Sequence, residues 1–188
     1  MRIEKLKAAF TLDVRFVHFP LHPETPEDGR SLEDLFRGRG VDVAASQERL
    51  KRLAQSEGLP YGDRTMTYNS RLAQELGAWA DSTTVDGRGE RLHDALFRAY
   101  FVDGVNLARQ EQLVALAEDV GLDPAAAADV LAGRTFRDAV DKDWQRSRDL
   151  GVTGVPTYVA GGNSVVGAQP YEVLEELVVA TGARRRRE

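Results

Sequence analysis

The chain has 188 residues, 42% hydrophobic and 29% charged, a composition typical of a globular protein with enough apolar side chains for a core. Its formal net charge of −5 gives no general attraction to nucleic acids or anionic membranes, so neither is expected as a partner. It contains no cysteine, which excludes disulfides, thiolate metal sites and a cysteine nucleophile within these residues.

The sequence contains no sign of a membrane segment or a secretory signal. No stretch approaches the roughly 20 consecutive apolar residues of a membrane-spanning helix. Residues 1–10 mix charged and apolar side chains and lack the continuous apolar run of a signal peptide. We therefore expect a cytoplasmic protein without a membrane partner.

Residues 1–30 predict a helix followed by a strand and a loop. Residues 2–10 place apolar side chains at helical spacing. Residues 12–19 alternate apolar and polar side chains, which predicts a strand that Pro20 ends. Residues 24–30 are rich in turn-forming residues and predict a loop.

A long block of helices follows. Ser31 is typical of the N-cap of a short helix that ends near residues 38–40. Asn69 or Ser70, and later Asp123, are expected to cap two further helices. Beyond the short helix, the pattern predicts helices over residues 44–58, 68–83, 88–104, 109–121, 123–133 and 135–151.

Strand character returns only near the C-terminus. Residues 157–160 and 164–166 are short β-type runs around Gly-Gly-Asn, which predicts a hairpin. Pro170 is expected to begin a last helix over residues 171–182.

This order predicts an α/β protein with one large insertion. Residues 1–30 and 151–183 are expected to form the two halves of the core, and residues 31–150 an all-helical insertion between them. Residues 184–188 are expected to be a solvated basic tail.

Several stretches resemble the DsbA-like thioredoxin-fold family, and in particular its FrnE-like branch. These stretches are HFPLHPETP, YNSRLAQELGAWA, LHDALFRAYFVDG, LVALAEDVGLD and the ending GVTGVPTYV…GAQP, and together they extend across nearly the whole chain. The resemblance implies a thioredoxin-like core with a large all-helical insertion, and a protein disulfide oxidoreductase or isomerase as the family activity.

The resemblance also implies a binding loop. In the family, a cis X-Pro bond precedes the third core strand, and the matching pair here is Val155-Pro156. The backbone before the proline faces the redox centre, where an extended polypeptide or a small thiol pairs with it like an added strand. Gly154, Val155 and Pro156 are therefore expected to bind the substrate, with Gly151 and Gly154 permitting close approach. The alternative is an ordinary turn with a trans proline.

Family members carry a strand and a C-x-x-C pair before their first helix, and neither appears in this sequence. We therefore expect the first core strand to be missing from the fold. One expectation is that the natural protein begins further upstream with this segment. A second is that residues 12–19 move into the vacant place and pair with residues 156–160. A third is that another copy supplies the strand, which would give a homodimer.

Two other groups of residues were candidates for a site. His18 and His22 lie on either side of Pro20 in a strand-to-loop segment without a third ligand, so we expect no metal. Asp138, Asp141 and Asp143 alternate with basic residues, which indicates a solvated helix face rather than a catalytic pair. No catalytic residue and no cofactor is therefore predicted within this chain.

Three functions remain open from the sequence. The first is a thiol–disulfide oxidoreductase family protein that is redox-inactive as written, because it has no cysteine. The second is a cysteine-free, chaperone-like protein that binds polypeptides at the proline loop. The third is a relative of kappa-class glutathione transferases or hydroxychromene carboxylate isomerases, whose activating serine would lie in the same missing segment.

Overall fold

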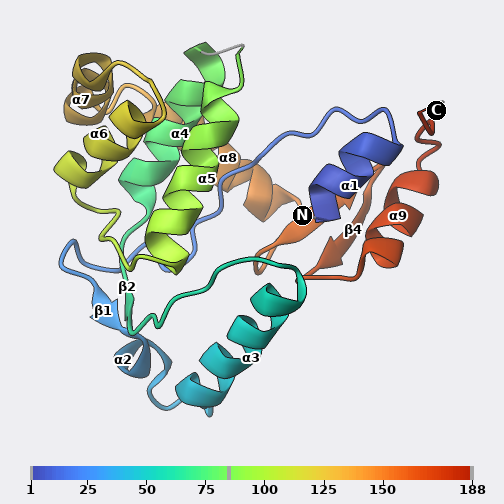
Figure 1. Cartoon of the computed structure of the whole chain (residues 1–188), viewed down its shortest axis with the longest axis horizontal. Helices are drawn as coiled ribbons and strands as arrows, with labels where there is room; N and C mark the ends of the chain where they lie inside the picture. The colour runs from blue at the N-terminus through green and yellow to red at the C-terminus, as the bar shows by residue number, and fades with distance from the viewer. Residues whose placement is uncertain (1, 84–85, 187–188) are drawn as a thin grey trace. The chain divides into compact units, whose positions relative to one another are not determined.

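The structure, a computed structural model, describes residues 2–83 and 86–186 (Figure 1). Contacts divide the chain into two units, Met1–Leu21 with Asp143–Glu188, and His22–Lys142. We call the first the core unit and the second the helical unit. The predicted boundaries, after residues 30 and 150, lie later in the chain than those of the two units.

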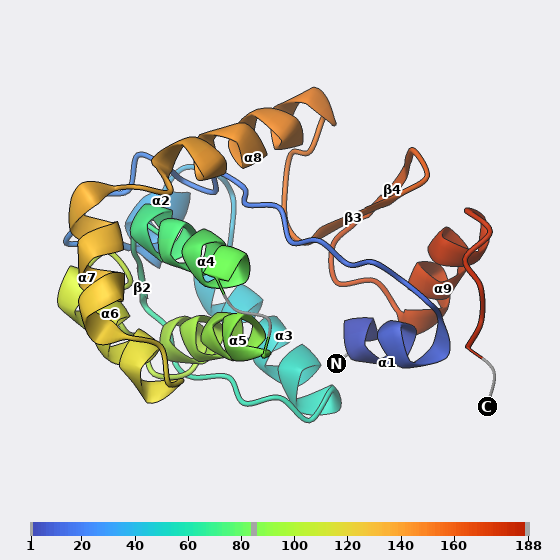
Figure 2. The ribbon, with the colours of Figure 1, turned by 90° about the horizontal axis from the view of Figure 1, so that it is seen from above.

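The core unit contains a hairpin and two helices that cover it (Figures 1 and 2). Its elements are α1 (Arg2–Ala9), the last part of α8 (Arg137–Asp149), β3 (Thr157–Ala160), β4 (Asn163–Val166) and α9 (Tyr171–Val179). Strands β3 and β4 pair antiparallel across Gly161 and Gly162. Both glycines have a positive φ, 53° and 84°, as a two-residue turn of this type requires. The predicted hairpin and both predicted helices are confirmed.

Helices α1 and α9 lie side by side on one face of the hairpin (Figures 1 and 2). The buried residues of this small core are Leu6, Phe10, Leu174 and Val178. Tyr158 and Val165, which face each other across the hairpin, pack against it. The opposite face of the hairpin carries Val159 and Val166, which are 45% and 50% exposed.

The strand predicted over residues 12–19 is wrong. Residues 11–20 form no strand, and the sheet of the core unit consists, within the described residues, of β3 and β4 alone. Alternating side chains become a strand only where a neighbour pairs with the backbone, and none is present here. Val14 and Phe16 are 36% and 52% exposed, so the alternation does not face a core. The expected pairing of this segment with residues 156–160 is therefore also wrong.

The sequence predicts a solvated tail over residues 184–188, but the described part of this tail is hydrogen-bonded to the core unit. The amide of Thr11 donates to the carbonyl of Arg184, and the amide of Arg186 donates to that of Ala9, at 2.8 and 2.9 Å. The guanidinium of Arg185 lies 4.8 Å from the ring centre of Phe10. Residues 184–186 are thus exposed but bound to the end of α1, whereas residues 187 and 188 lie outside the described part.

The helical unit confirms each helix predicted between residues 31 and 151. Its elements are β1 (Arg30–Ser31), α2 (Leu32–Phe36), α3 (Val43–Ser56), β2 (Met66–Thr67), α4 (Arg71–Thr83), α5 (Arg88–Phe101), α6 (Gln110–Asp119), α7 (Pro124–Gly133) and the start of α8. Strands β1 and β2 were not predicted, so the insertion is not all-helical. Each has two residues, which is too short for an alternating pattern to reveal.

Side-chain caps fix the start of four of these helices, and one of them, Asp42 at the start of α3, was not predicted. The other three are as follows. The Ser31 hydroxyl accepts from the amide of Asp34 at 3.0 Å, and the Asp123 carboxylate from that of Ala125 at 3.0 Å. The Asn69 side-chain oxygen accepts from the amide of Arg71 at 2.9 Å. These caps are the ones predicted from the sequence.

Helices α4 to α7 enclose the larger of the two cores. Its buried residues are Ala73, Leu76, Trp79, Ala80, Leu92, Leu96, Ala99, Leu107, Leu113, Ala117, Leu122, Ala127 and Leu131. The carboxylate of Glu75 is fully buried beside this cluster and belongs to α4. Helix α3 contributes no buried residue to this unit.

Candidate functional site

The predicted binding loop joins α8 to β3 within the core unit. The peptide bond between Val155 and Pro156 is cis. The carbonyl of Gly154 accepts from the Thr157 hydroxyl at 2.7 Å, and the carbonyl of Pro156 accepts from the amide of Gly167 at 2.7 Å. The carbonyls on both sides of Val155 are therefore occupied.

The backbone of Val155 is unpaired within the described residues. The residue is 48% exposed, and its amide and carbonyl have no hydrogen-bond partner among the described residues. Buried backbone amides and carbonyls are almost always hydrogen-bonded within the protein, whereas exposed ones can bind water or a ligand. The loop thus offers one free donor and one free acceptor on the same residue.

The two glycines of the loop have different roles. Gly151 has a φ of 67° and follows the end of α8, where its amide donates to Arg148 and the amide of Val152 donates to Ser147. This is the Schellman pattern of hydrogen bonds that ends many helices. It explains why a glycine stands at position 151, without the predicted role of permitting a ligand to approach the loop. A Cβ added to Gly154 would meet nothing within 4 Å, so the space next to this residue is open.

Asp143 is buried, whereas the sequence predicts that it lies on a solvated helix face. It is 8% exposed and accepts from the amide of His18 at 3.2 Å, with the His18 ring nitrogen Nδ1 at 2.9 Å. The Ser147 hydroxyl donates to the carbonyl of His18 at 3.1 Å. These contacts attach the segment before the helical unit to the last turns of α8. Asp138 and Asp141 are exposed, as predicted.

A signal for this contact was present in the sequence. The buried residues of α8 are Val140, Asp143 and Ser147, which recur at i, i+3 and i+7 and so share one helix face. His22, by contrast, belongs to the helical unit, where its ring lies 3.8 Å from the Glu24 carboxylate. Among the described residues, no group of three or more His, Asp or Glu side chains is placed to hold a metal ion.

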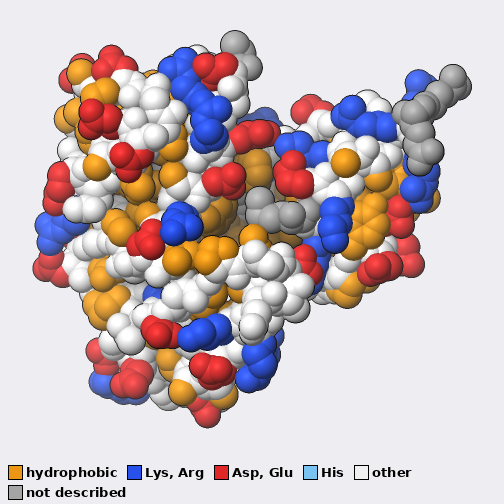
Figure 3. Space-filling model, in the orientation of Figure 1, with side chains coloured by type: hydrophobic (Ala, Val, Ile, Leu, Met, Phe, Trp, Pro, Cys, Tyr) orange, Lys and Arg blue, Asp and Glu red, His pale blue; other side chains and the backbone are white. Residues whose placement is uncertain are grey.

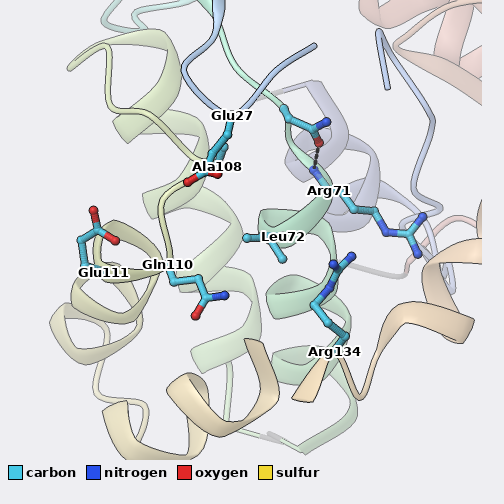
Figure 4. A pocket seen from close by; sticks show the side chains of 8 residues that line it. Glu27, Arg71, Leu72, Ala108, Gln110, Glu111 and Arg134 are labelled. Carbon is cyan, nitrogen blue, oxygen red and sulfur yellow. Dashed lines mark hydrogen bonds between the residues drawn. The ribbon is translucent and has the colours of Figure 1, made fainter. Parts of the chain in front are cut away.

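The helical unit contains a pocket of about 520 Å³ that the sequence did not predict (Figure 4). Its lining is Glu27, Asn69, Arg71, Leu72, Ala108, Gln110, Glu111 and Arg134. Figure 4 shows the side chains of Gln110 and Arg134 pointing into the pocket, whereas Glu111 points away from the other residues.

The charges of this pocket are compensated within the unit. Arg71 and Arg134 both donate to the buried carboxylate of Glu75, at 2.6 to 2.7 Å. Burial alone would raise the pKa of Glu75, but the hydrogen bonds from the two arginines outweigh it and lower the pKa. Glu27 in turn accepts from Arg109 at 2.7 Å. The pocket is therefore polar and balanced in charge, and it supports no catalytic assignment.

On the face drawn in Figure 3, acidic and basic side chains are interspersed, and no basic patch stands out. None of the described helices is both long and apolar enough to cross a membrane. The feature that remains for binding a polypeptide is the backbone of Val155 with the open space at Gly154.

Known proteins resemble this chain over most of its length. Residues 1–179 match the family model of the DSBA-like thioredoxin domain. A structure described as a probable DsbA oxidoreductase, SCO1869 of Streptomyces coelicolor, is 32% identical with a TM-score of 0.85, and covers 100% of this chain and 85% of its own. A 2-hydroxychromene-2-carboxylate isomerase is 25% identical with a TM-score of 0.60, over 74% of this chain and 66% of its own.

A curated relative matches a shorter stretch. The uncharacterized protein YwbO of Bacillus subtilis is 29% identical over 92 residues, which are 48% of this chain and 46% of that protein. The match thus covers less than half of the relative's length. The family model and the first structure, by contrast, span nearly the whole chain, and both confirm a thioredoxin-like α/β fold with a helical insertion. The chain belongs to the DSBA-like thioredoxin domain family.

Proposed function

We propose that the chain is a member of the DsbA-like thiol–disulfide oxidoreductases in which Gly154, Val155 and Pro156 hold the partner molecule. The partner is an extended polypeptide, and these 188 residues supply no thiol of their own. The observation that supports this most is the exposed backbone of Val155, whose amide and carbonyl have no partner among the described residues.

A free amide and carbonyl on one residue suit a main-chain ligand. An extended polypeptide presents the complementary carbonyl and amide at every second residue and pairs with such a backbone as an added strand. This kind of binding depends little on the partner's sequence. It therefore fits a protein of a family whose substrates are diverse polypeptides.

Thiol–disulfide exchange itself requires a thiolate that attacks a disulfide sulfur, with a mixed disulfide as intermediate. The 188 residues contain no cysteine, so they hold no group for this attack. We expect the rate of insulin reduction by dithiothreitol to be the same with and without the protein. Turnover above the protein-free control would overturn this part of the proposal.

Binding is tested by calorimetry with an unfolded, cysteine-free polypeptide. Gly154→Val places a side chain in the open space beside the loop, where a Cβ meets nothing within 4 Å, so the fold is expected to persist while binding weakens. Ala168→Val, in the exposed segment after β4, is the matched control and is expected to bind normally. Equal affinity of the two variants would exclude the loop as the binding site.

One comparison favours a second candidate, in which the partner is a small thiol such as glutathione. The likeness to a 2-hydroxychromene-2-carboxylate isomerase, at 25% identity, supports a relation to the glutathione-linked branch of this superfamily. Calorimetric titration with glutathione, alongside the polypeptide, separates the two candidates. Saturable binding of glutathione without binding of the polypeptide would favour the second.

The finer assignments of the sequence analysis remain proposals. Membership in the FrnE-like branch rests on the sequence stretches quoted above. Disulfide isomerase activity would need thiols, which these residues do not supply. A homodimer is one way in which a further strand could be supplied to the sheet. A cytoplasmic location is likewise a proposal.

A further inference from the structure

The pocket of the helical unit is lined by hydrogen-bonding groups that the unit itself does not use. Arg134 donates to Glu75 through Nε and Nη2, whereas its Nη1 has no partner among the described residues. The side-chain amide of Gln110 is likewise unpaired within the described chain, as is the carboxylate oxygen Oε2 of Glu27, whose Oε1 accepts from Arg109. Arg134, Gln110 and Glu27 all belong to the lining, so these groups are available to a ligand.

The guanidinium of Arg134 is fixed before any ligand arrives. Two hydrogen bonds of 2.7 Å join it to the carboxylate of Glu75, which is fully buried. A pair of this kind sets the plane of the guanidinium as well as its position. The backbone of Arg134 has a φ of 51°, a conformation usually taken by glycine after a helix, and it directs this side chain toward Glu75 and the pocket (Figure 4). A donor held in this way loses little freedom on binding.

The pocket has a donor at one side and a carboxylate at the other, with apolar surface between them. Figure 4 shows Leu72 between Glu27 and Arg134, and Ala108 next to Glu27. Ala108 is buried, and Leu72 packs with one side against the large core. The amide of Gln110, which also points into the pocket, provides both a donor and an acceptor.

The charges around the pocket favour a ligand without net charge. Arg134 is neutralised by Glu75, and Glu27 by Arg109. A ligand with a net charge would therefore lose water without a compensating charge in the protein. A zwitterion is neutral as a whole, and its two charged groups can bind the donor side and the carboxylate side separately. The volume of about 520 Å³ is that of a site for a small molecule.

We propose that this pocket binds a free α-amino acid with an apolar side chain. The carboxylate of the amino acid accepts from Arg134 Nη1 and from the Gln110 amide, its ammonium group donates to Glu27, and its side chain lies over Leu72. The site lies wholly within the helical unit and does not involve the proline loop. It is therefore independent of the proposed function.

Calorimetric titration of the full chain with L-leucine tests the proposal. We expect saturable binding with a dissociation constant of about 1 mM or lower. N-acetyl-L-leucine lacks the ammonium group and L-leucinamide lacks the carboxylate. Each is expected to bind about tenfold more weakly than leucine, because each leaves one charged group of the pocket without its partner.

Glu27→Gln tests the ammonium contact. Glu27 is exposed, so the fold is expected to persist in this variant. We expect leucine to bind about tenfold more weakly and N-acetyl-leucine to bind as before, because only leucine carries the ammonium group. Asp28→Asn is the matched control: Asp28 is also exposed and also binds Arg109, but it does not line the pocket. This variant is expected to bind leucine normally.

Gln110→Ala tests the carboxylate side. We expect the variant to bind leucine about fivefold more weakly, because one hydrogen bond to the carboxylate is lost. Gln112→Ala, in the same turn of α6 and equally exposed, lies outside the lining and is expected to have no effect. The loop variant Gly154→Val is also expected to bind leucine normally, which separates this site from the one proposed at the proline loop.

Three results would overturn the proposal. The first is the absence of saturable binding up to about 20 mM leucine. The second is binding of N-acetyl-leucine as tightly as leucine, which would show that the protein recognises an anion and not a zwitterion. The third is an equal effect of each test variant and its control, or a loss of binding in Gly154→Val, which would place the amino acid elsewhere in the chain.

Discussion

At the scale of single residues, Glu75 is the most strongly held carboxylate of the helical unit. It is fully buried and receives hydrogen bonds from Arg71 on its own helix and from Arg134 after α7. Arg71 also pairs with Asp141 of α8 at 2.8 Å. One buried group thus links α4 to the end of α7, and Arg71 extends the link to α8.

Replacement of this carboxylate tests its contribution to stability. Glu75→Gln leaves two guanidinium groups without their buried counter-charge, and we expect the free energy of unfolding to fall by about 3–5 kcal/mol. Asp141→Asn removes a half-exposed partner of the same Arg71 and is expected to cost no more than about 1 kcal/mol. Urea unfolding followed by circular dichroism measures both. Similar losses in the two variants would mean that Glu75 is not the centre of the network.

The same residue predicts a dependence on pH. Its pKa is lowered in the folded state, so its contribution to stability is present above the unfolded-state pKa and is lost as the pH falls through the lower, folded-state value. We expect the free energy of unfolding to decrease below about pH 4.5, and to decrease less steeply in Glu75→Gln. Asp86 and Asp141, whose pKa values are lowered by hydrogen bonds from Arg88 and Arg71, contribute in the same direction. Identical pH profiles for the two proteins would contradict this account.

The sequence predicted some of these residue environments and not others. The caps Ser31, Asn69 and Asp123 are local, because each side chain binds an amide two or three residues further on. Arg134, which binds Glu75, and His18, which binds Asp143, are distant from these carboxylates in sequence. Composition and spacing alone do not show that such residues meet. The exposed face of α8 was therefore predicted correctly and its buried face was not.

At the scale of elements, the connection between α3 and β2 depends on a close approach at Gly62. Its amide donates to the carbonyl of Phe101 at 2.9 Å, and a Cβ added there would lie 2.0 Å from the carbonyl oxygen of Val102. Only a glycine permits this connection to lie against the end of α5. The contact is between backbone atoms, which have little freedom to move.

Gly62→Ala is therefore expected to lower the free energy of unfolding by about 1–3 kcal/mol, because the connection must move away from α5. Gly154→Ala, where an added Cβ meets nothing, is the control and is expected to change stability by less than about 0.5 kcal/mol. Thermal unfolding of the two variants measures the difference. Equal melting temperatures would show that the connection adapts without cost.

Helices and the hairpin were predictable at this scale, and the longer strand was not. A helix satisfies its backbone within itself, and the hairpin of residues 157–166 satisfies its own across a two-residue turn. Residues 12–19 have the pattern of a strand but no neighbour to pair with, so the pattern alone was misleading.

At the scale of the whole molecule, the two units differ in the size of their cores. The helical unit encloses a continuous apolar cluster of 13 buried residues between four helices, whereas the apolar cluster of the core unit has four, Leu6, Phe10, Leu174 and Val178, around a two-stranded hairpin. Within one chain, regions with fewer buried apolar contacts open at a lower free energy than regions with more of them. The unit that carries the proposed binding loop is therefore expected to be the less stable one.

Hydrogen–deuterium exchange with mass spectrometry tests this difference on the intact chain. We expect peptides from α4, α5 and α7 to be protected for longer than peptides from α1, β3, β4 and α9, because the smaller core opens first. Uniform protection across both units would show that the chain opens as one cooperative body.

The central claim, that the free backbone of Val155 holds an extended polypeptide, is tested most directly by residue-resolved NMR amide exchange with and without an unfolded, cysteine-free polypeptide. The account predicts slower exchange of the amide of Val155 on binding, with those of Ser164 and Val166 unchanged. Binding that leaves the amide of Val155 unaffected, or that protects only those of β4, would contradict it.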